Sequence, residues 1–455
     1  MTRFDDVMMT FRDVSQYSNE GRQGKATAYL APDIRTRFAA FEDHYRIPSL
    51  LHSDPPAHRR LRALIRDTFT PRAVAALEPR IRAITADLID QAEPAGGMDA
   101  VSDFAAVDLP ATVISEIFGV LAADGARFVA WSDDILAFQG VNKPAPEILE
   151  KAHDTLLLLR AHLGEMILDR RRAPRDDLLG TLVAAEEAGD RLSQEELINT
   201  SVTLLAAGHE TTRSLIGNGP FLLLSDRIHW QQLLAESALV KPAIEEILRY
   251  ESPVPRQPRL MKTGAVLSGE RIRKGEMVYQ MLNAANRDPA HFAEPETFDL
   301  RRQANRHLAF GNGIHFCLGA PLAGLEGQIA FSTLLNASRG FSCSARNRTG
   351  IPASATRACC AHCRSCSDQP APSVAMRGVD MRPKLTMRDL LESNGQRKLT
   401  MTNAADTAVH AFEAFVADVR TGEFPGPGHL ASAGDDVVRA FVAAIDSPSP
   451  DRHTP

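Results

Sequence analysis

The sequence predicts a mainly α-helical fold with a small β portion. From residue 52 to residue 340, apolar residues recur mostly at the three- and four-residue spacing of an amphipathic helix. Only residues 259–283 change to short runs of β-forming residues separated by turns. The chain has 455 residues, of which 44% are hydrophobic and 24% charged, as in an ordinary globular protein. We therefore expect a large, mostly helical core.

Composition and charge argue against several classes of protein. The formal net charge is −6, which gives no support for a nucleic-acid partner. The N-terminus has no apolar run of the signal-peptide type, and no stretch approaches the roughly 18 apolar residues of a membrane span. We expect a cytoplasmic protein with no nucleic-acid and no membrane partner.

The first clear helix is expected between Asp54 and Pro71. Asp54 suits the cap position, and Pro55 suits the first helical turn. Leu61 and Ile65 then lie four residues apart, as on the apolar face of a helix. The pattern predicts an amphipathic helix that stops at Pro71.

A long apolar helix is expected near the middle of the chain. Ser193 and Glu196 have the spacing of a capping box, in which each side chain bonds the other residue's backbone amide. Gly217, Gly219 and Pro220 disfavour a helix, and proline also removes a backbone donor. We expect the helix to end or bend there.

The next segments change in character. A helix is expected to begin at Pro242 and to stop before Pro253, and short β segments follow at 265–267 and 277–279 around a Ser-Gly turn. Residues 284–310 then form a long irregular connection. A loop of that length inside a domain is usually functional.

Residues 310–319 are the most informative part of the chain. They read Phe-Gly-Asn-Gly-Ile-His-Phe-Cys-Leu-Gly and hold a single cysteine, Cys317. Glycines let the backbone adopt positive φ and approach a flat ligand closely. A helix that begins just after the sulfur directs its positive end at it and stabilises a thiolate, which is the ligand that a haem iron needs to cleave O₂. The alternative is a buried structural cysteine in a turn.

The order F-G-x-G-x-H-x-C-x-G resembles the haem-binding loop of cytochromes P450, and the resemblance extends over about residues 4–336. It implies a cytochrome P450 fold with haem b as cofactor and Cys317 as the axial iron ligand. It also implies that the loop residues Phe310 and Gly311 contact the haem.

The haem propionates need positive partners. In the order of the family, these would be His58 and Arg62 on one helix face, Arg259 before the β segments, and His315 beside the cysteine. Each of the four, taken alone, could equally be a solvated surface charge.

The motif Ala-Gly-His-Glu-Thr-Thr at 207–212 resembles the family's distal helix. Cleavage of O₂ needs protons, and the resemblance assigns their delivery to the acid–alcohol pair Glu210 and Thr211. The alternative is a threonine that bonds back to its own helix beside a surface acid.

Glu246 and Arg249 share a helix face, because they lie three residues apart. They resemble the family's structural ExxR ion pair, whose third partner would be Arg302 or His307. The alternative is an exposed helix pair.

Four arginines crowd one helical region: Arg59, Arg60, Arg66 and Arg72. Such a surface suits an acidic electron donor such as a ferredoxin. The alternative is a solvated basic face.

These features predict a monooxygenase that inserts one oxygen atom of O₂ into an apolar small molecule. Its electrons would come from NAD(P)H through a ferredoxin-type donor and its reductase. The alternative is a truncated, inactive relative with weak or no haem binding. The family's opening helix and first β strands and its C-terminal β strands are not recognisable in the sequence.

The extent of the resemblance predicts three segments along the chain. Residues 1–336 are expected to form the haem domain, and residues 337–380 form a Ser-, Arg- and Cys-rich segment that we expect to be disordered. Residues 381–428 resemble parts of ketopantoate hydroxymethyltransferases. An active barrel of that kind needs about 200 residues or more, so we assign no catalytic role to the tail 381–455.

The remaining five cysteines follow Cys317, and three of them have C-x₂-C-x₂-C spacing. That spacing also occurs among iron–sulfur ligands, which leaves a metal-binding module as a third interpretation of the chain. The five are Cys343, Cys359, Cys360, Cys363 and Cys366.

Overall fold

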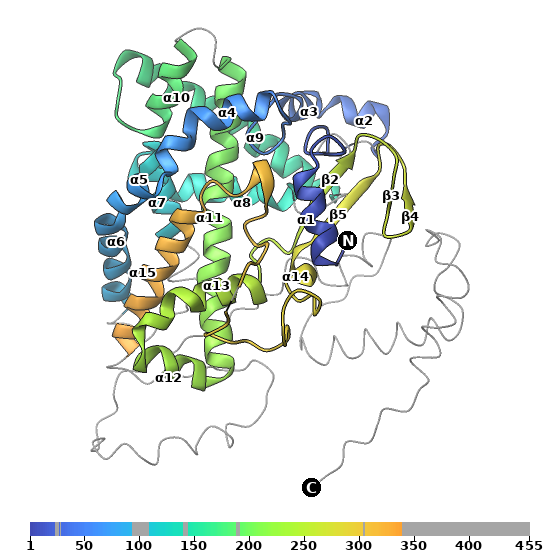
Figure 1. Ribbon diagram of the computed structural model, residues 1–455. Coiled ribbons are helices and arrows are strands. Elements are labelled where there is room, and N and C mark those ends of the chain that lie inside the picture. The colour runs from blue at the N-terminus through green and yellow to red at the C-terminus, as the bar shows by residue number, and fades with distance from the viewer. Residues whose placement is uncertain are drawn as a thin grey trace. The chain divides into compact units, whose positions relative to one another are not determined.

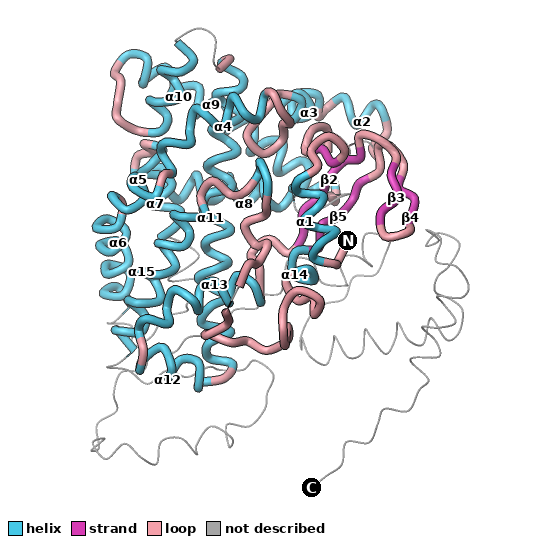
Figure 2. The backbone as a smooth tube through the Cα atoms, viewed as in Figure 1, coloured by secondary structure: helices cyan, strands magenta, loops and turns pink. Residues whose placement is uncertain are grey.

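The computed structural model describes residues 1–338 except 23–26, 28, 93–108, 140–143, 188–191 and 304. The described residues belong to one compact unit, in which helices predominate and strands are few (Figure 2). The expected fold class, mainly α with a small β portion, is confirmed. The five later cysteines, the segment 339–380 and the tail 381–455 lie outside the described residues.

The helices surround α11 (Gln194–Ser225), the longest of those described (Figure 1). It packs against α7, α8, α9, α13 and α15. The other helices are α1 (Phe4–Arg12), α2 (Pro32–Thr36), α3 (Ala39–Arg46), α4 (Ala57–Ile65), α5 (Pro71–Ala76), α6 (Glu78–Ala92), α7 (Leu109–Phe118), α8 (Gly125–Gln139), α9 (Pro146–Arg172), α10 (Leu178–Glu187), α12 (Arg227–Ala235), α13 (Val240–Tyr250), α14 (Leu282–Ala285) and α15 (Ala320–Ser338).

The capping box at the start of α11 is confirmed, because Ser193 and Glu196 exchange both expected hydrogen bonds. Of the two outcomes expected near Pro220, an end or a bend, the end is wrong, since α11 continues through this residue to Ser225. Packing explains the difference. The backbone of Gly219 lies so close to α15 that an added Cβ would be 2.1 Å from Cζ of Phe331, so tertiary contacts outweigh the local preference.

The cap expected for α4 is also wrong. The helix begins at Ala57 without a side-chain cap. Asp54 instead accepts hydrogen bonds from Ser18 Oγ at 2.6 Å and from the Asn19 amide at 3.1 Å, and it pairs with Lys262 at 2.7 Å. Its carboxylate therefore ties the N-terminal segment to the β portion rather than to a helix end.

The β portion has two small antiparallel sheets. One has the order β1 (Tyr17–Ser18), β2 (Arg256–Met261) and β5 (Met277–Met281), and the other is the hairpin of β3 (Ala265–Leu267) and β4 (Glu270–Ile272). The two residues at the hairpin turn have positive φ, 50° at Ser268 and 88° at Gly269, as tight hairpin turns require.

The first sheet positions one candidate site residue. Arg259 of β2 faces Val278 of β5 in the register, and its side chain is buried on the inner face. Among the described residues, no helix combines the length and apolar character needed to cross a membrane.

Candidate haem site

The cysteine loop has the backbone that its glycines predict. Gly311 and Gly313 have φ of 71° and 69°, and an added Cβ on Gly313 would lie 2.6 Å from the carbonyl oxygen of Phe11. The amide of Cys317 donates to the carbonyl of Phe310 at 2.9 Å. The loop is thus held against α1 and closed on itself just before α15 begins at Ala320.

Opposing effects act on the pKa of the Cys317 thiol. Burial raises its pKa, whereas the backbone amides of Gly319 and Ala320 and the charge of Arg62 oppose that increase. The residue is nevertheless accessible to solvent, as a side chain on the wall of a cavity would be. A metal ion bound to this sulfur would displace its proton, and the two amides would then stabilise the thiolate.

The structure brings together the four predicted cationic residues. The rings of His58 and His315 lie 4.1 Å apart between centroids. Arg62 donates to the carbonyl of Phe316 at 2.8 Å, and the charges of Arg62 and Arg259 both act on His315. Residues from α4, β2 and the cysteine loop therefore converge beside Cys317.

A fifth cation, Arg22, belongs to the same cluster and was not singled out by the sequence. It is buried, donates to the carbonyl of Pro258 at 3.3 Å, and its charge acts on both Arg259 and His315. No motif surrounds it. Its place follows from the pairing of β1 with β2, which brings residues near 22 next to residues near 258.

Among the described residues, the cluster has little compensating negative charge. Burial lowers the pKa of His58 to about 4, that of His315 to about 2 and that of Arg259 to about 9, and the neighbouring cations add to this effect. The one carboxylate that acts on it, Asp54, is already bonded elsewhere.

Several donors of the cluster are also without partners. Both ring nitrogens of His58, Nε2 of His315 and Nε of Arg22 are buried without a hydrogen-bond partner among the described residues. Buried polar groups are normally paired. A ligand with two carboxylates would satisfy this site, so the residues present fit a haem with its two propionates.

The distal motif lies midway along α11. Thr211 Oγ1 donates to the carbonyl of Ala207 at 3.3 Å, and Glu210 forms an ion pair with Arg213. An added Cβ on Gly208 would lie 2.6 Å from Cγ1 of Ile114, so this glycine allows α7 to approach α11. The back-bonded threonine considered above is therefore what the structure shows for Thr211.

The predicted ion pair is buried. Glu246 and Arg249 are wholly inaccessible and lie 2.7 Å apart. Arg302 is the third partner, at 3.1 Å from Glu246, and Asn305, which the sequence did not single out, also donates to Glu246 at 3.1 Å. His307 contacts Glu245 at 3.0 Å instead.

The guanidinium of Arg249 also organises the irregular connection. It donates to the carbonyls of Asn286 at 2.9 Å, Pro295 at 2.8 Å and Thr297 at 3.1 Å. Farther along, the amide of Leu308 donates to the side chain of Asn286 at 2.7 Å. This network fixes the segment that leads into the cysteine loop.

The basic region divides into paired and exposed members. Arg60 pairs with Glu196 and Arg66 with Asp67. Arg59 and Arg72 are exposed, and so is Arg66, whose pair with Asp67 lies at the surface. Of the four arginines, only Arg60 is partly withdrawn from the surface available to an acidic partner.

Comparison with known proteins agrees with this geometry. A family model described as "Cytochrome P450" matches residues 24–352. The putative cytochrome P450 YjiB of Bacillus subtilis is 40% identical over 297 residues, which are 65% of this chain and 75% of that protein.

Two solved structures are similar to the described fold. P450BioI, in complex with hexadec-9Z-enoic acid ligated acyl carrier protein, has a TM-score of 0.68 and 33% identity over 74% of this chain and 84% of that one. Myxobacterial CYP267B1, in complex with myristic acid, has a TM-score of 0.67 and 38% identity over 74% of this chain and 82% of that one. The chain belongs to the cytochrome P450 family of monooxygenases.

Proposed function

We propose that this chain binds haem b through Cys317 and inserts one oxygen atom of O₂ into an apolar small molecule. The observation that carries the proposal is the cluster of arginines and histidines, which has little compensating negative charge among the described residues and lies beside a cysteine that receives two backbone amides. Haem carries two carboxylates, which would neutralise the positive charge, and an iron, which would bind the cysteine thiolate. When bound, the haem iron supplies the activation of O₂, which its thiolate ligand promotes.

The residues that hold the cofactor are assigned by their charge and position. His58, Arg62, Arg259 and His315 bind the propionates, and we add Arg22 to this set. Phe310 and Gly311 support the haem on the cysteine side, where the carbonyl of Phe310 is bonded to the amide of Cys317.

Glu210 and Thr211 manage proton delivery on the distal side. For this role the Thr211 hydroxyl gives up its hydrogen bond to the carbonyl of Ala207. Glu210 gives up its ion pair with Arg213 and takes up a proton. Positioned acids and bases of this kind typically contribute about 10²–10⁴-fold to a rate.

The substrate is an apolar molecule, and a long-chain fatty acid is the first candidate to test. The complexes of P450BioI and CYP267B1 contain hexadecenoic acid on a carrier protein and myristic acid, respectively. The apolar side chains between residues 29 and 47 do not by themselves define the walls of a substrate pocket. Phe41 and Phe138 pack edge to face with centroids 4.7 Å apart and belong to the core.

Electrons come from NAD(P)H through a ferredoxin-type donor and its reductase. Arg59 and Arg72 offer exposed positive charge on α4 and α5, and Phe316, next to Cys317, is 43% exposed. Attraction of this kind is screened by salt, so electron transfer should slow as ionic strength rises.

The deciding experiment is an absorption spectrum of the haem-supplemented protein, reduced and then exposed to carbon monoxide. The proposal expects the red-shifted Soret band of thiolate ligation. Cys317→Ala should abolish this band, whereas Cys343→Ala is the matched control and should keep it. A chain without the band in its unaltered form would be the inactive relative.

The cation assignments have a separate test. A charge-assisted hydrogen bond contributes about 1.5–3 kcal/mol, so Arg259→Met should weaken haem binding about ten- to a hundredfold. Arg256→Met, two residues earlier on the same strand, is the control and should have little effect. Haem titration followed in the Soret band measures both, and equal affinities would refute the role of Arg259.

A further inference from the structure

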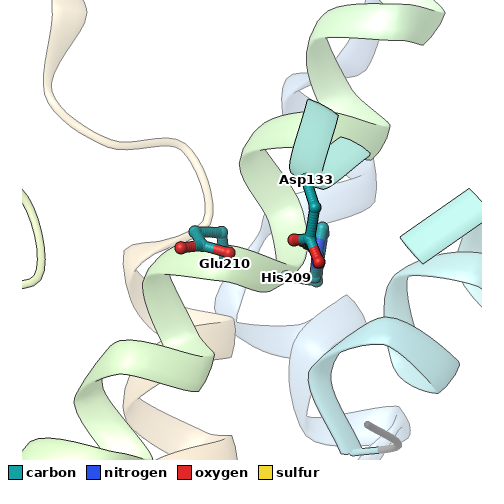
Figure 3. A group of neighbouring side chains, drawn as sticks. All are labelled: Asp133, His209 and Glu210. Carbon is teal, nitrogen blue, oxygen red and sulfur yellow. Dashed lines mark ion pairs between the residues drawn. The ribbon is translucent and has the colours of Figure 1, made fainter. Parts of the chain in front are cut away.

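A compact group of charges lies where α8 meets α11 (Figure 3). Asp133 of α8 approaches three residues on one stretch of α11. Its Oδ1 lies 3.5 Å from Nε2 of His209 and 3.4 Å from Nη1 of Arg213. The other amine of Arg213 pairs with Glu210. Ligand atoms of Asp133, His209 and Glu210 lie within 4.8 Å of one another.

The charged side chains in this group share a partner. Two carboxylates share one guanidinium, and the imidazole of His209, which is almost completely buried, lies beside Asp133. Although burial raises the pKa of Asp133, its interactions with His209, Arg213 and Glu210 lower that pKa to about 2. Asp133 is thus an anion at any ordinary pH.

The surroundings of Asp133 contain two further charges. Lys151 of α9 acts on it at longer range, but its ammonium is bonded to Asp134 at 2.7 Å. Arg213 is therefore the cation that Asp133 and Glu210 both contact.

We propose that Asp133 is a positioning residue for Glu210. The inference rests on the proposed function, in which Glu210 supplies protons. Without a competitor, Arg213 would pair with Glu210 alone, since the two are three residues apart on one helix. A carboxylate bound to a guanidinium holds protons poorly.

Asp133 changes this balance in two ways. It attracts the same guanidinium from the neighbouring helix, and its carboxylate lies within 4.8 Å of the carboxylate of Glu210. The competition weakens the contact between Arg213 and Glu210, which lies next to Thr211. Two interacting carboxyl groups bind their protons as a pair rather than independently.

The same three ligand types could hold a divalent cation. Here the guanidinium of Arg213 already lies in ion-pair contact with both carboxylates. We therefore assign the group a protonic rather than a metallic role.

The test compares Asp133→Asn with a matched control, Asp134→Asn. Asp134 follows on the same helix but bonds Lys151 and Thr155, which lie on α9 rather than α11. The first measurement is infrared difference spectroscopy of the haem-loaded protein, in which Glu210→Gln identifies the carboxyl band of Glu210. In Asp133→Asn this band should change in frequency, because Arg213 then contacts Glu210 alone, and in Asp134→Asn it should not move.

The second measurement is turnover of myristic acid with a surrogate ferredoxin and its reductase. Asp133→Asn should lower the rate of product formation about tenfold and raise the share of electrons released as hydrogen peroxide. It should also alter the pH profile and the solvent isotope effect. Asp133→Glu keeps the charge and should restore coupling.

The outcomes distinguish the positioning role of Asp133 from the proton-delivery role of Glu210. If Glu210→Gln is impaired but Asp133→Asn matches Asp134→Asn in both measurements, the positioning role is wrong and the proposed function stands. If Glu210→Gln itself keeps normal coupling and pH dependence, the proton-delivery role of Glu210 is wrong, and the role of Asp133 is overturned with it. A double variant no worse than either single variant would support both.

Discussion

Burial raises the pKa of two acidic groups near the start of α15. The neighbouring groups that oppose this rise differ between them. The Cys317 thiol receives two backbone amides and lies near Arg62. The carboxyl group of Glu326, two turns farther on, is fully buried and is bonded only to Thr212, so its pKa rises to about 8. One of its oxygens has no partner among the described residues. Glu326 is therefore expected to be a neutral acid inside the fold.

This neutrality makes stability depend on pH. The unfolded chain releases the Glu326 proton above its ordinary pKa of 4.5, whereas the folded protein keeps it up to about 8. The stabilising contribution is complete below about pH 4.5 and is lost as the pH rises to about 8, by roughly 3–5 kcal/mol. Glu326→Gln should remove this slope.

Urea unfolding at a series of pH values measures the effect. Glu165→Gln, at an exposed carboxylate of α9, is the control and should keep the slope of the unaltered protein. A Glu326→Gln variant with the same slope would show that Glu326 ionises freely in the folded state.

The residues that could be predicted from the sequence are those with a fixed order along the chain. Cys317, Arg62 and Arg259 were identified because the motifs of the family occur in sequence around them. Arg22 and Asp133 were not, because each meets its partners across long stretches of chain and no local pattern marks them. Contacts of this kind become visible only when the strands and helices are packed.

At the scale of elements, α11 shows how tertiary contacts set helix limits. Local preference predicted an end near Pro220, yet the helix continues to Ser225. Its Gly219 faces the ring of Phe331 on α15, and an added Cβ would lie 2.1 Å from Cζ of that ring. The glycine is therefore needed for close packing of the two helices, which the sequence alone could not reveal.

Gly219→Ala should destabilise the protein. Overpacking of a core costs about 1–3 kcal/mol, which exceeds the roughly 1 kcal/mol that alanine gains in a helix. Gly164→Ala on α9 is the matched control, because no atom lies within 4 Å of its added Cβ, and it should stabilise instead. Chemical denaturation measures both changes, and Phe331→Leu should partly rescue Gly219→Ala. Equal stabilities for the two alanine variants would contradict the packing argument.

At the scale of the whole molecule, the distribution of charge matters more than its sum. The chain carries a net charge of −6, yet the interior beside Cys317 gathers positive and protonatable groups. Four members of the cluster were predictable from the sequence, but Arg22 was not, nor was the shortage of counter-charge, which depends on where Asp54 bonds. Such a cluster suits an anionic ligand, as the proposed haem would be.

Removal of haem should therefore make the protein sensitive to acid. The pKa of His58 falls to about 4 and that of His315 to about 2 in the fold, from 6.5. The unfolded chain binds these protons first, so stability is complete above about pH 6.5 and is lost as the pH falls through about 4. Propionates would favour the charged imidazoles and reduce this loss.

Thermal unfolding of the haem-free and haem-loaded proteins across this pH range measures the difference. His58→Gln should reduce the acid sensitivity of the haem-free form only. Identical pH profiles with and without haem would show that the imidazoles do not face the propionates.

The hydrogen bonds of Arg249 have a consequence for the way the cofactor is acquired. They join the chain to itself around residues 286–297, and none of them involves a cofactor. These bonds hold the segment that leads into the thiol loop, so we expect that segment to be ordered before haem binds. Preorganisation of this kind reduces the entropy lost on binding, so we expect haem to bind with little further folding of the chain.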